Sequence, residues 1–282
     1  MRKLILILTI FLGSWLAAIG GLWAFQRALI YSPDRVDYVP PSHYAMLEGV
    51  EEIALEAADG VDLRAWYAPA PRNRPTVVIF PGKGGSLRSQ RYRVQLFKES
   101  GMGVLLLAYR GYSGNEGEPS EQGLYADARA ALDWLDAQGV PDRSVTLYGV
   151  SLGTGVATAM AAEHEYGALV LEAPYTSVVD VAAARFPIVP VELIIVDRFD
   201  SLSRIDEVDE PLLVMHGDTD RVIPQRFGRE LFDAADSPKS GFWPEGVGHK
   251  DIFDRGGFEA ARDFIESSMT PVAPPRLRSP RA

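Results

Sequence analysis

Cysteine is absent from this chain of 282 residues. Its absence excludes thiol catalysis, disulfide bonds and thiolate metal sites, and it is compatible with an oxidising compartment. A His-Glu-x-x-His sequence or a comparable ligand cluster is also missing, so nothing in the sequence supports a bound metal. We therefore expect a protein that works without metal or cofactor.

Positive charge is scarce as well. The chain has 28 Lys and Arg residues against 38 Asp and Glu residues, which gives a net charge of −10. Such an acidic balance argues against nucleic acid as a partner. Hydrophobic residues make up 47 % of the chain and charged residues 23 %, which is ordinary for a globular protein. The length suits a single α/β domain with a two-sided core.

The N-terminus carries the first strong signal, an apolar run without charge. Leu4 to Phe25 covers 22 residues, which at about 1.5 Å per residue just spans a hydrocarbon core of about 30 Å. We predict a transmembrane anchor over residues 1–25. A cleaved signal peptide would look similar, although only Ala18-Ile19-Gly20 offers a weak cleavage site.

The charges beside this run bear on its orientation. Arg2 and Lys3 precede it, which favours a cytoplasmic N-terminus and a catalytic domain on the non-cytoplasmic side, the periplasmic side in a bacterium. Arg27 and Arg35 on the other flank act against this orientation. We expect a single-pass membrane protein.

The rest of the chain divides by composition. Residues 26–50 are rich in Pro and Tyr and are predicted to form a linker, and the Pro-rich residues 269–282 a disordered tail. Between them, residues 51–268 alternate short apolar runs with helical stretches, which predicts a mostly parallel sheet with helices on both faces. The predicted strands lie near 51–57, 62–68, 76–80, 103–108, 144–148, 168–171 and 211–215, and the predicted helices near 87–100, 121–138, 151–164, 224–235 and 257–268.

A G-x-S-x-G motif follows one of the buried strands. Gly149-Val150-Ser151-Leu152-Gly153 comes directly after Val145–Tyr148 and directly before the small, apolar stretch 154–162. This strand–turn–helix setting is that of a nucleophile elbow, in which the residues two before and two after the serine must be small. We predict Ser151 as a nucleophile. The alternative is a glycine-rich turn with an incidental serine.

A nucleophilic serine needs a base, and two histidines follow Ser151 at a useful distance. His249 lies in a late glycine-containing loop, Gly246–His249, which could aim its ring across the carboxyl ends of the strands. His216 ends a buried run and is better explained by a structural hydrogen bond. We predict His249 as the base.

The base in turn needs an acid. In chains with a nucleophile elbow of this kind, the acid lies between the serine and the histidine in the sequence. The loop after residue 215 offers Asp218 and Asp220. Asp218 suits a turn residue bonded to nearby backbone N–H groups. Asp220 lies further along the loop and is predicted to orient His249, with Glu172 as the candidate if neither aspartate matters.

Two backbone N–H groups are expected to form an oxyanion hole. One is the N–H of Leu152, which follows the nucleophile. The other is predicted to be that of Lys83, in the glycine-rich loop Pro81–Gly85 after an apolar strand. The same loop could suggest a phosphate site, but it lacks the spacing of the known phosphate-binding motifs.

Taken in order, these motifs give the chain a family resemblance. It resembles membrane-anchored α/β-hydrolases of the serine-aminopeptidase-like group, whose members carry stretches similar to several segments of this chain. In this sequence the matching segments are Gln26–Pro33, Tyr109–Gly117, Leu171–Ser177, His216-Gly217 with Asp220, and Gly248-His249. One departure is that Pro81-Gly82-Lys83 stands where most relatives have His-Gly and then Asn.

The resemblance implies an α/β-hydrolase fold with a small cap, no cofactor, and a triad of Ser151, Asp220 and His249. We expect a serine hydrolase that cleaves a small-molecule or lipid-like acyl ester, thioester or amide. The cap is expected within residues 174–200, whose apolar side chains either pack in the core or form a wall for an acyl chain. The alternative function is a non-catalytic, membrane-anchored binding protein on the same fold.

Overall fold

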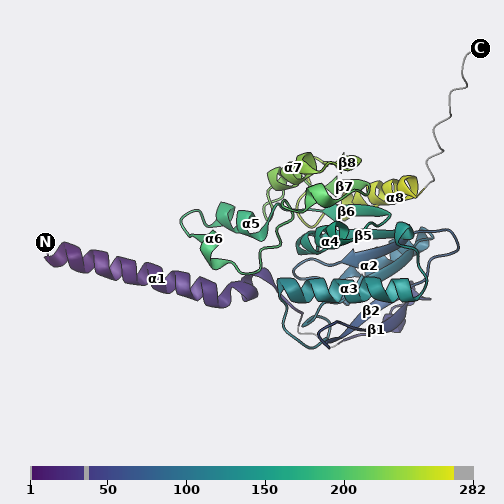
Figure 1. The fold of residues 1–282 in the computed structure, drawn as a ribbon, viewed down its shortest axis with the longest axis horizontal. Helices are drawn as coiled ribbons and strands as arrows, with labels where there is room; N and C mark the ends of the chain where they lie inside the picture. The colour runs from purple at the N-terminus through teal and green to yellow at the C-terminus, as the bar shows by residue number, and fades with distance from the viewer. Residues whose placement is uncertain (1, 35–37, 270–282) are drawn as a thin grey trace, which may run out of the picture.

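The body of the protein is one eight-stranded sheet. The computed structural model describes residues 2–34 and 38–269, and Figure 1 shows the sheet flanked by helices, with the first helix projecting from the body. The strands are β1 (Glu51–Glu56), β2 (Asp62–Ala68), β3 (Thr76–Phe80), β4 (Gly103–Leu107), β5 (Val145–Val150), β6 (Ala168–Glu172), β7 (Leu212–Met215) and β8 (Lys239–Phe242).

The helices alternate with the strands from β3 onward. The α-helices are α1 (Arg2–Ile30), α2 (Leu87–Glu99), α3 (Glu121–Ala137), α4 (Leu152–Glu163), α5 (Val178–Arg185), α6 (Val191–Ile194), α7 (Gln225–Ala234) and α8 (Gly257–Ser268). Short 3₁₀ turns are η1 (Pro41–His43), η2 (Ala45–Leu47), η3 (Asp142–Ser144), η4 (Ile205–Glu207) and η5 (Phe253–Arg255).

The sheet is mostly parallel, as predicted. Its strand order is β1-β2-β4-β3-β5-β6-β7-β8. The pairs β1–β2 and β2–β4 are antiparallel and the remaining pairs are parallel. Strand β8 was not predicted from the sequence. Its residues are mostly exposed at the edge of the sheet, so it lacks the apolar run that marks the inner strands.

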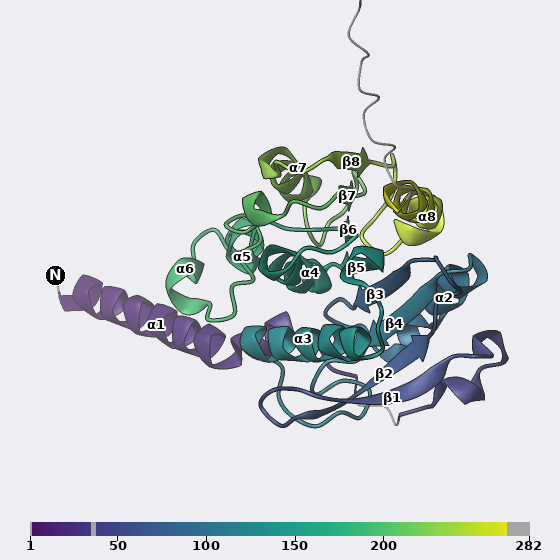
Figure 2. The same cartoon turned by 45° about the vertical axis from the view of Figure 1, so that its right-hand side comes forward.

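Helices cover both faces of the sheet, which explains why the inner strands are apolar on both sides. One core lies between the sheet and helices α3, α4 and α7, and the other between the sheet and helices α2 and α8. Figure 2 shows α3 and α4 on one side of the strands and α2 and α8 on the other. This two-sided packing fixes the carboxyl ends of β5 and β7, from which the site is built.

Helix α1 has the length and composition of a membrane span. An 18-residue window in it has a mean hydropathy of 2.2 and is 0 % buried in the protein. The helix therefore fits a single membrane anchor. It continues to Ile30, beyond residue 25, because Gln26–Ile30 contains no helix breaker and the first proline is Pro33.

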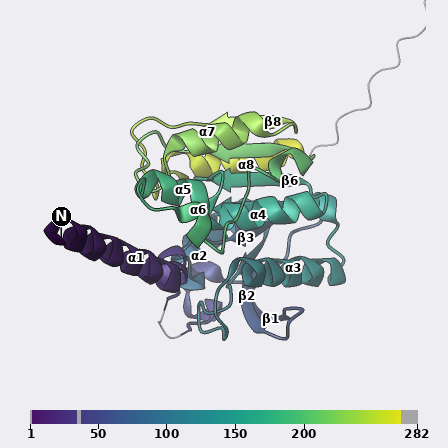
Figure 3. The ribbon, with the colours of Figure 1, turned by 60° about the vertical axis from the view of Figure 1, so that its left-hand side comes forward.

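The segment after residue 25 packs on the body of the protein. Gln26 is 8 % exposed, and Tyr31 and Leu47 are buried in the two cores. Figure 3 shows the C-terminal end of α1 on the same side of the body as α5 and α6, and α1 and α6 are in contact. The described residues between the anchor and β1, 26–34 and 38–50, thus pack on the domain. Of the predicted tail, residues 269–282, only Met269 is among the described residues.

Candidate active site

Ser151 occupies a sharp turn between β5 and α4. Its φ of 49° and ψ of −116° place it in a backbone region that L-residues rarely adopt. The two flanking glycines make the turn possible. A Cβ added at Gly153 would lie 2.0 Å from the Phe80 carbonyl oxygen, and one added at Gly149 would lie 2.6 Å from the Thr154 Cα. The structure therefore gives the G-x-S-x-G motif the steric reason expected for a nucleophile elbow.

His249 lies within hydrogen-bonding distance of the serine. Its Nε2 is 3.0 Å from the Ser151 Oγ, and its Nδ1 is 2.6 Å from an oxygen of Asp220. Since the carboxylate can only accept, the neutral ring carries its proton on Nδ1 and donates it to Asp220. Nε2 is then left free to accept a proton from the Ser151 hydroxyl.

Asp220 is held rigidly in the loop after β7. Its Oδ1 accepts hydrogen bonds from the backbone N–H groups of Val222 and Ile223, at 2.8 and 2.9 Å. Burial acts to raise its pKa, but the hydrogen bonds from His216 and His249 outweigh burial, so the pKa lies well below its ordinary value. Asp220 is therefore ionised at neutral pH. Asp218, the other aspartate considered, is exposed to solvent.

His216 approaches the same carboxylate oxygen of Asp220 as His249 does. Its Nε2 is 2.8 Å from the Ile223 carbonyl oxygen and 3.3 Å from an oxygen of Asp220. A carbonyl oxygen only accepts, so Nε2 carries the proton and donates it there. The ring is fully buried, which fits the structural hydrogen bond expected for this residue.

The loop that carries Lys83 approaches the elbow closely. A Cβ added at Gly82 would meet the Val150 carbonyl oxygen at 3.0 Å and the Ser151 Cβ at 3.2 Å, so a larger residue would press the loop away from the elbow. The Lys83 carbonyl accepts hydrogen bonds from the Tyr112 hydroxyl at 2.7 Å and from the Ser32 N–H at 3.2 Å. Burial raises the pKa of Tyr112 to about 12, so its hydroxyl keeps the proton that it donates.

Leu152 is the first residue of α4, where backbone N–H groups have no partner within the helix. Its carbonyl accepts a hydrogen bond from the Tyr175 hydroxyl at 3.0 Å. Burial raises the pKa of Tyr175 well above its ordinary value. The two residues predicted as oxyanion donors thus each accept, at their carbonyl, a hydrogen bond from a buried tyrosine. The donor roles of Lys83 and Leu152 stay predictions.

A buried ion pair supports the elbow from behind. The Ser151 N–H donates to the Glu172 carbonyl at 2.8 Å. The Glu172 carboxylate accepts two hydrogen bonds from Arg93, at 2.6 and 2.7 Å, and one from the Tyr148 hydroxyl at 2.5 Å. This carboxylate is therefore fully engaged away from His249, and the structure gives no support to Glu172 as the acid.

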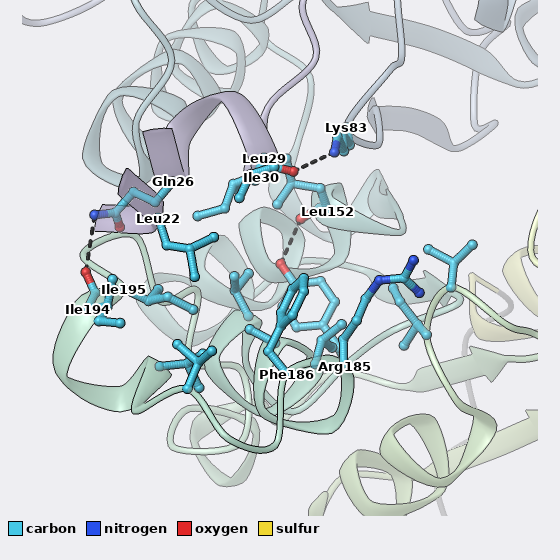
Figure 4. A pocket seen from close by; sticks show the side chains of 18 of the residues that line it. Leu22, Gln26, Leu29, Ile30, Lys83, Leu152, Arg185, Phe186, Ile194 and Ile195 are labelled. Carbon is cyan, nitrogen blue, oxygen red and sulfur yellow. Dashed lines mark hydrogen bonds between the residues drawn. The ribbon is translucent and has the colours of Figure 1, made fainter. Parts of the chain in front are cut away.

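A cavity of about 470 Å³ opens beside Ser151, which is within the range of small-molecule sites. Figure 4 shows its wall, to which α1 contributes Leu22, Gln26, Leu29 and Ile30. The segment 174–200 contributes the facing wall. Its lining residues are Tyr175, Val178, Val181, Ala182, Arg185, Phe186, Val189, Val191, Ile194 and Ile195. Across residues 2–34 and 38–269, no cluster of His, Asp and Glu side chains could hold a metal ion.

The structure thus brings together all five residues predicted from the sequence. It also adds side chains that sequence reasoning missed. Tyr112 and Tyr175 stand in segments already noticed for their resemblance, which is the signal that could have found them. Arg93 gave no signal, because a lone arginine in a polar helix looks like a solvated residue. Gln26 likewise stands in a segment noticed for its resemblance, Gln26–Pro33, but nothing there pointed to the cap as its partner.

Comparison with known proteins agrees with this architecture. A profile described as "alpha/beta hydrolase fold" matches residues 75–187. The chain is 38 % identical over 251 residues to an uncharacterised protein of Mycobacterium tuberculosis, with 86 % of this chain and 88 % of the relative covered. It is 30 % identical to the alpha/beta hydrolase domain-containing protein WAV2 of Arabidopsis thaliana, with 87 % of this chain and 88 % of the relative covered.

Solved structures show the same fold at lower identity. A Pyrococcus furiosus esterase matches with a TM-score of 0.70 and 18 % identity, covering 85 % of this chain and 100 % of the esterase. A Butyrivibrio proteoclasticus protein solved with ferulic acid, Est1E, matches with a TM-score of 0.65 and 18 % identity, covering 77 % and 99 % of the two chains. These likenesses bear on the fold alone.

Proposed function

Because the chain belongs to the α/β-hydrolase family, we propose that it is a serine hydrolase that cleaves an acyl ester, thioester or amide through an acyl-enzyme on Ser151. The observation that carries this proposal is the unbroken row of hydrogen bonds from Asp220 through His249 to Ser151, at 2.6 and 3.0 Å. An ionised carboxylate, an imidazole and a serine hydroxyl in this order are the arrangement that activates a serine as a nucleophile, which favours an enzyme over a protein that only binds a partner.

Each of these residues has a role in the proposed acylation step. The Ser151 Oγ attacks the acyl carbonyl carbon while its proton passes to Nε2 of His249. The Asp220 carboxylate holds the Nδ1–H tautomer and stabilises the imidazolium that forms. The backbone N–H groups of Leu152 and Lys83 stabilise the negative charge on the carbonyl oxygen, with the positive end of α4 behind them.

The second half of the reaction reverses these proton movements. His249 gives its proton to the leaving oxygen, sulfur or nitrogen as the bond to the acyl carbon breaks. A water molecule then loses a proton to Nε2 and attacks the acyl-Ser151 carbonyl, and the proton returns to the Oγ as the acid is released. No redox or metal step is needed for this sequence.

Helix α1 would hold this enzyme in a membrane as a single-pass anchor. With Arg2 and Lys3 before the apolar run, the catalytic domain would lie on the non-cytoplasmic side. The substrate would be a small molecule or lipid-like acyl compound, since the cavity beside Ser151 is lined mainly by apolar side chains.

The test is hydrolysis by full-length protein in detergent, with nitrophenyl esters, acyl thioesters and acyl anilides as substrates. Ser151→Ala should lower the best rate by roughly 10⁴-fold or more, as loss of a triad member does in other serine hydrolases. Ser240→Ala, an exposed serine on β8, is the matched control and should keep wild-type rates. Wild-type protein that turns over none of these substrates would favour the binding protein instead.

A further inference from the structure

The cavity beside Ser151 has a wall that comes from the predicted membrane anchor. Leu22, Leu29 and Ile30 of α1 line it together with Ser151 and Leu152. Leu22 also belongs to the uncharged run from Leu4 to Phe25. One helix therefore serves both the apolar run and the catalytic cavity, and the cavity is incomplete without it.

Specific hydrogen bonds fix the end of α1 against the cap segment, residues 174–200. The Gln26 amide donates to the Ile194 carbonyl at 3.1 Å, and its oxygen accepts from the Val196 N–H at 2.7 Å. Arg27 forms an ion pair with the buried carboxylate of Asp197 at 3.0 Å. A buried amide with both ends satisfied holds one geometry, so α1 and the cap form one wall.

The same helix is tied to the loop that carries the predicted oxyanion donor. The Lys83 ammonium donates to the Leu29 carbonyl in the last turn of α1, and the two residues are joined in Figure 4. Leu29 therefore lies at the end of the α1 wall that is next to the loop of Lys83 and Ser151. Leu22 lies two turns earlier, about 10 Å along the helix at about 1.5 Å per residue. An acyl chain on Ser151 that follows α1 would run toward the membrane.

Helix length places this wall at the membrane surface. The 29 residues of α1 span about 43 Å, against a hydrocarbon core of about 30 Å. With Leu4–Phe25 across the core, the lining residues Gln26, Leu29 and Ile30 lie past its edge, and Leu22 lies just inside it. The cap beside them is apolar and exposed, with Ile188 81 % and Leu193 87 % accessible. Exposed side chains of this kind suit insertion among lipid headgroups and acyl chains.

The charged residues of the cavity suit the same position. Arg185 and Arg221 both line it, and neither has an ion-pair partner among the residues the structure describes. In a protein with a net charge of −10, two unpaired cations beside an apolar cavity at the membrane surface are placed to face anionic headgroups.

We propose that α1 is one wall of the acyl-binding site as well as an anchor, and that the substrate is a long-chain acyl lipid that reaches Ser151 from the bilayer. This inference rests on the proposed hydrolase function and names its substrate class. The scissile carbonyl would sit between Ser151 and the loop of Lys83. The acyl chain would lie between α1 and the cap, in the direction of Leu22.

The experiment compares two substitutions of the same residue type in α1, with full-length protein in phosphatidylglycerol vesicles. Leu22→Trp fills the membrane end of the cavity. Leu16→Trp, at a position that is 54 % exposed and does not line the cavity, is the control. The readout is the ratio of kcat/KM for a palmitoyl ester to kcat/KM for an acetyl ester of the same alcohol. A fluorogenic diacyl lipid is then supplied in the same vesicles as the protein or in separate ones.

We expect Leu22→Trp to lower the palmitoyl-to-acetyl ratio by about tenfold or more, the loss that follows when roughly two methylenes leave the cavity. Leu16→Trp should leave the ratio at its wild-type value, and the diacyl lipid should be cleaved only in the vesicles that contain the protein. An unchanged ratio in Leu22→Trp, or equal cleavage of lipid in separate vesicles, overturns the proposal. If wild-type protein cleaves neither the acetyl nor the palmitoyl ester, the proposed hydrolase function itself fails.

Discussion

Replacing Asp220 with asparagine probes the site with the smallest change of shape. The Asp220 Oδ1 accepts from the Val222 and Ile223 N–H groups, and its Oδ2 accepts from His249 Nδ1 at 2.6 Å. In Asp220→Asn the amide oxygen must stay on the two backbone donors, which turns the NH₂ group toward His249. Two donors would then face each other unless the ring moves its proton to Nε2.

The size of the loss follows from that tautomer change. With its proton on Nε2, His249 cannot accept the proton of the Ser151 hydroxyl. Serine proteases with the same substitution lose roughly 10⁴-fold in kcat, which corresponds to about 5 kcal/mol of transition-state stabilisation. We expect a loss of this size in kcat for a nitrophenyl ester at neutral pH, with KM little changed.

The same substitution should alter stability in a pH-dependent way. The native state holds the pKa of Asp220 below its ordinary value, so the ionised carboxylate stabilises the fold above the unfolded pKa, about 3.9, and this contribution is lost as pH falls. Asp220→Asn should therefore be less stable than wild type at neutral pH, by about 2 kcal/mol for lost charge-assisted hydrogen bonds. The difference should shrink in acid, as urea denaturation at several pH values would measure.

Asp218→Asn is the matched control, because Asp218 lies in the same loop and is exposed. It should keep the rate and the stability of wild type within a factor of a few. Equal losses in the two variants, or a larger loss in Asp218→Asn, would refute the assignment of Asp220 and the tautomer argument with it.

Two further predictions concern stability and the elbow. Burial raises the pKa of Glu210 from 4.5 to about 7. Between these two pH values the unfolded chain has released the proton while the folded chain still holds it. The free energy of unfolding should therefore fall by roughly 3 kcal/mol as pH rises through this range. Glu210→Gln should abolish this part of the pH dependence in urea denaturation, and parallel curves for the two proteins would contradict it. Gly153→Ala would place a Cβ 2.0 Å from the Phe80 carbonyl and should lower Tm and abolish esterase activity. Gly84→Ala, with no atom within 4 Å of an added Cβ, should do neither.

Much of the architecture could be predicted because it depends on local patterns. Strands such as β3 and β5 are buried on both faces, so they read as uninterrupted apolar runs between turn residues. The elbow at Ser151 was predictable because the turn requires small residues two positions before and after the serine, and both positions are glycine. Chain order then limited the choice of base and acid to the loops that contain His249 and Asp220.

What escaped prediction depends on contacts between distant segments. Helix α1 is apolar on every side, so nothing in its periodicity shows that Leu22 and Ile30 face a cavity while Leu16 does not. The partner of Gln26 lies at Ile194, 168 positions away in the chain. Strand β8 pairs with β7 along its backbone, and such pairing needs no apolar side chains that a pattern could reveal.

The most direct measurement is the location of a covalent adduct. Full-length protein in detergent is treated with a fluorophosphonate, digested, and mapped by mass spectrometry, with and without a competing acyl ester. We expect one adduct, on Ser151, which the ester suppresses and which is absent from the His249→Ala variant at matched times. An adduct on another serine, or an unlabelled protein that still cleaves the ester, would contradict it.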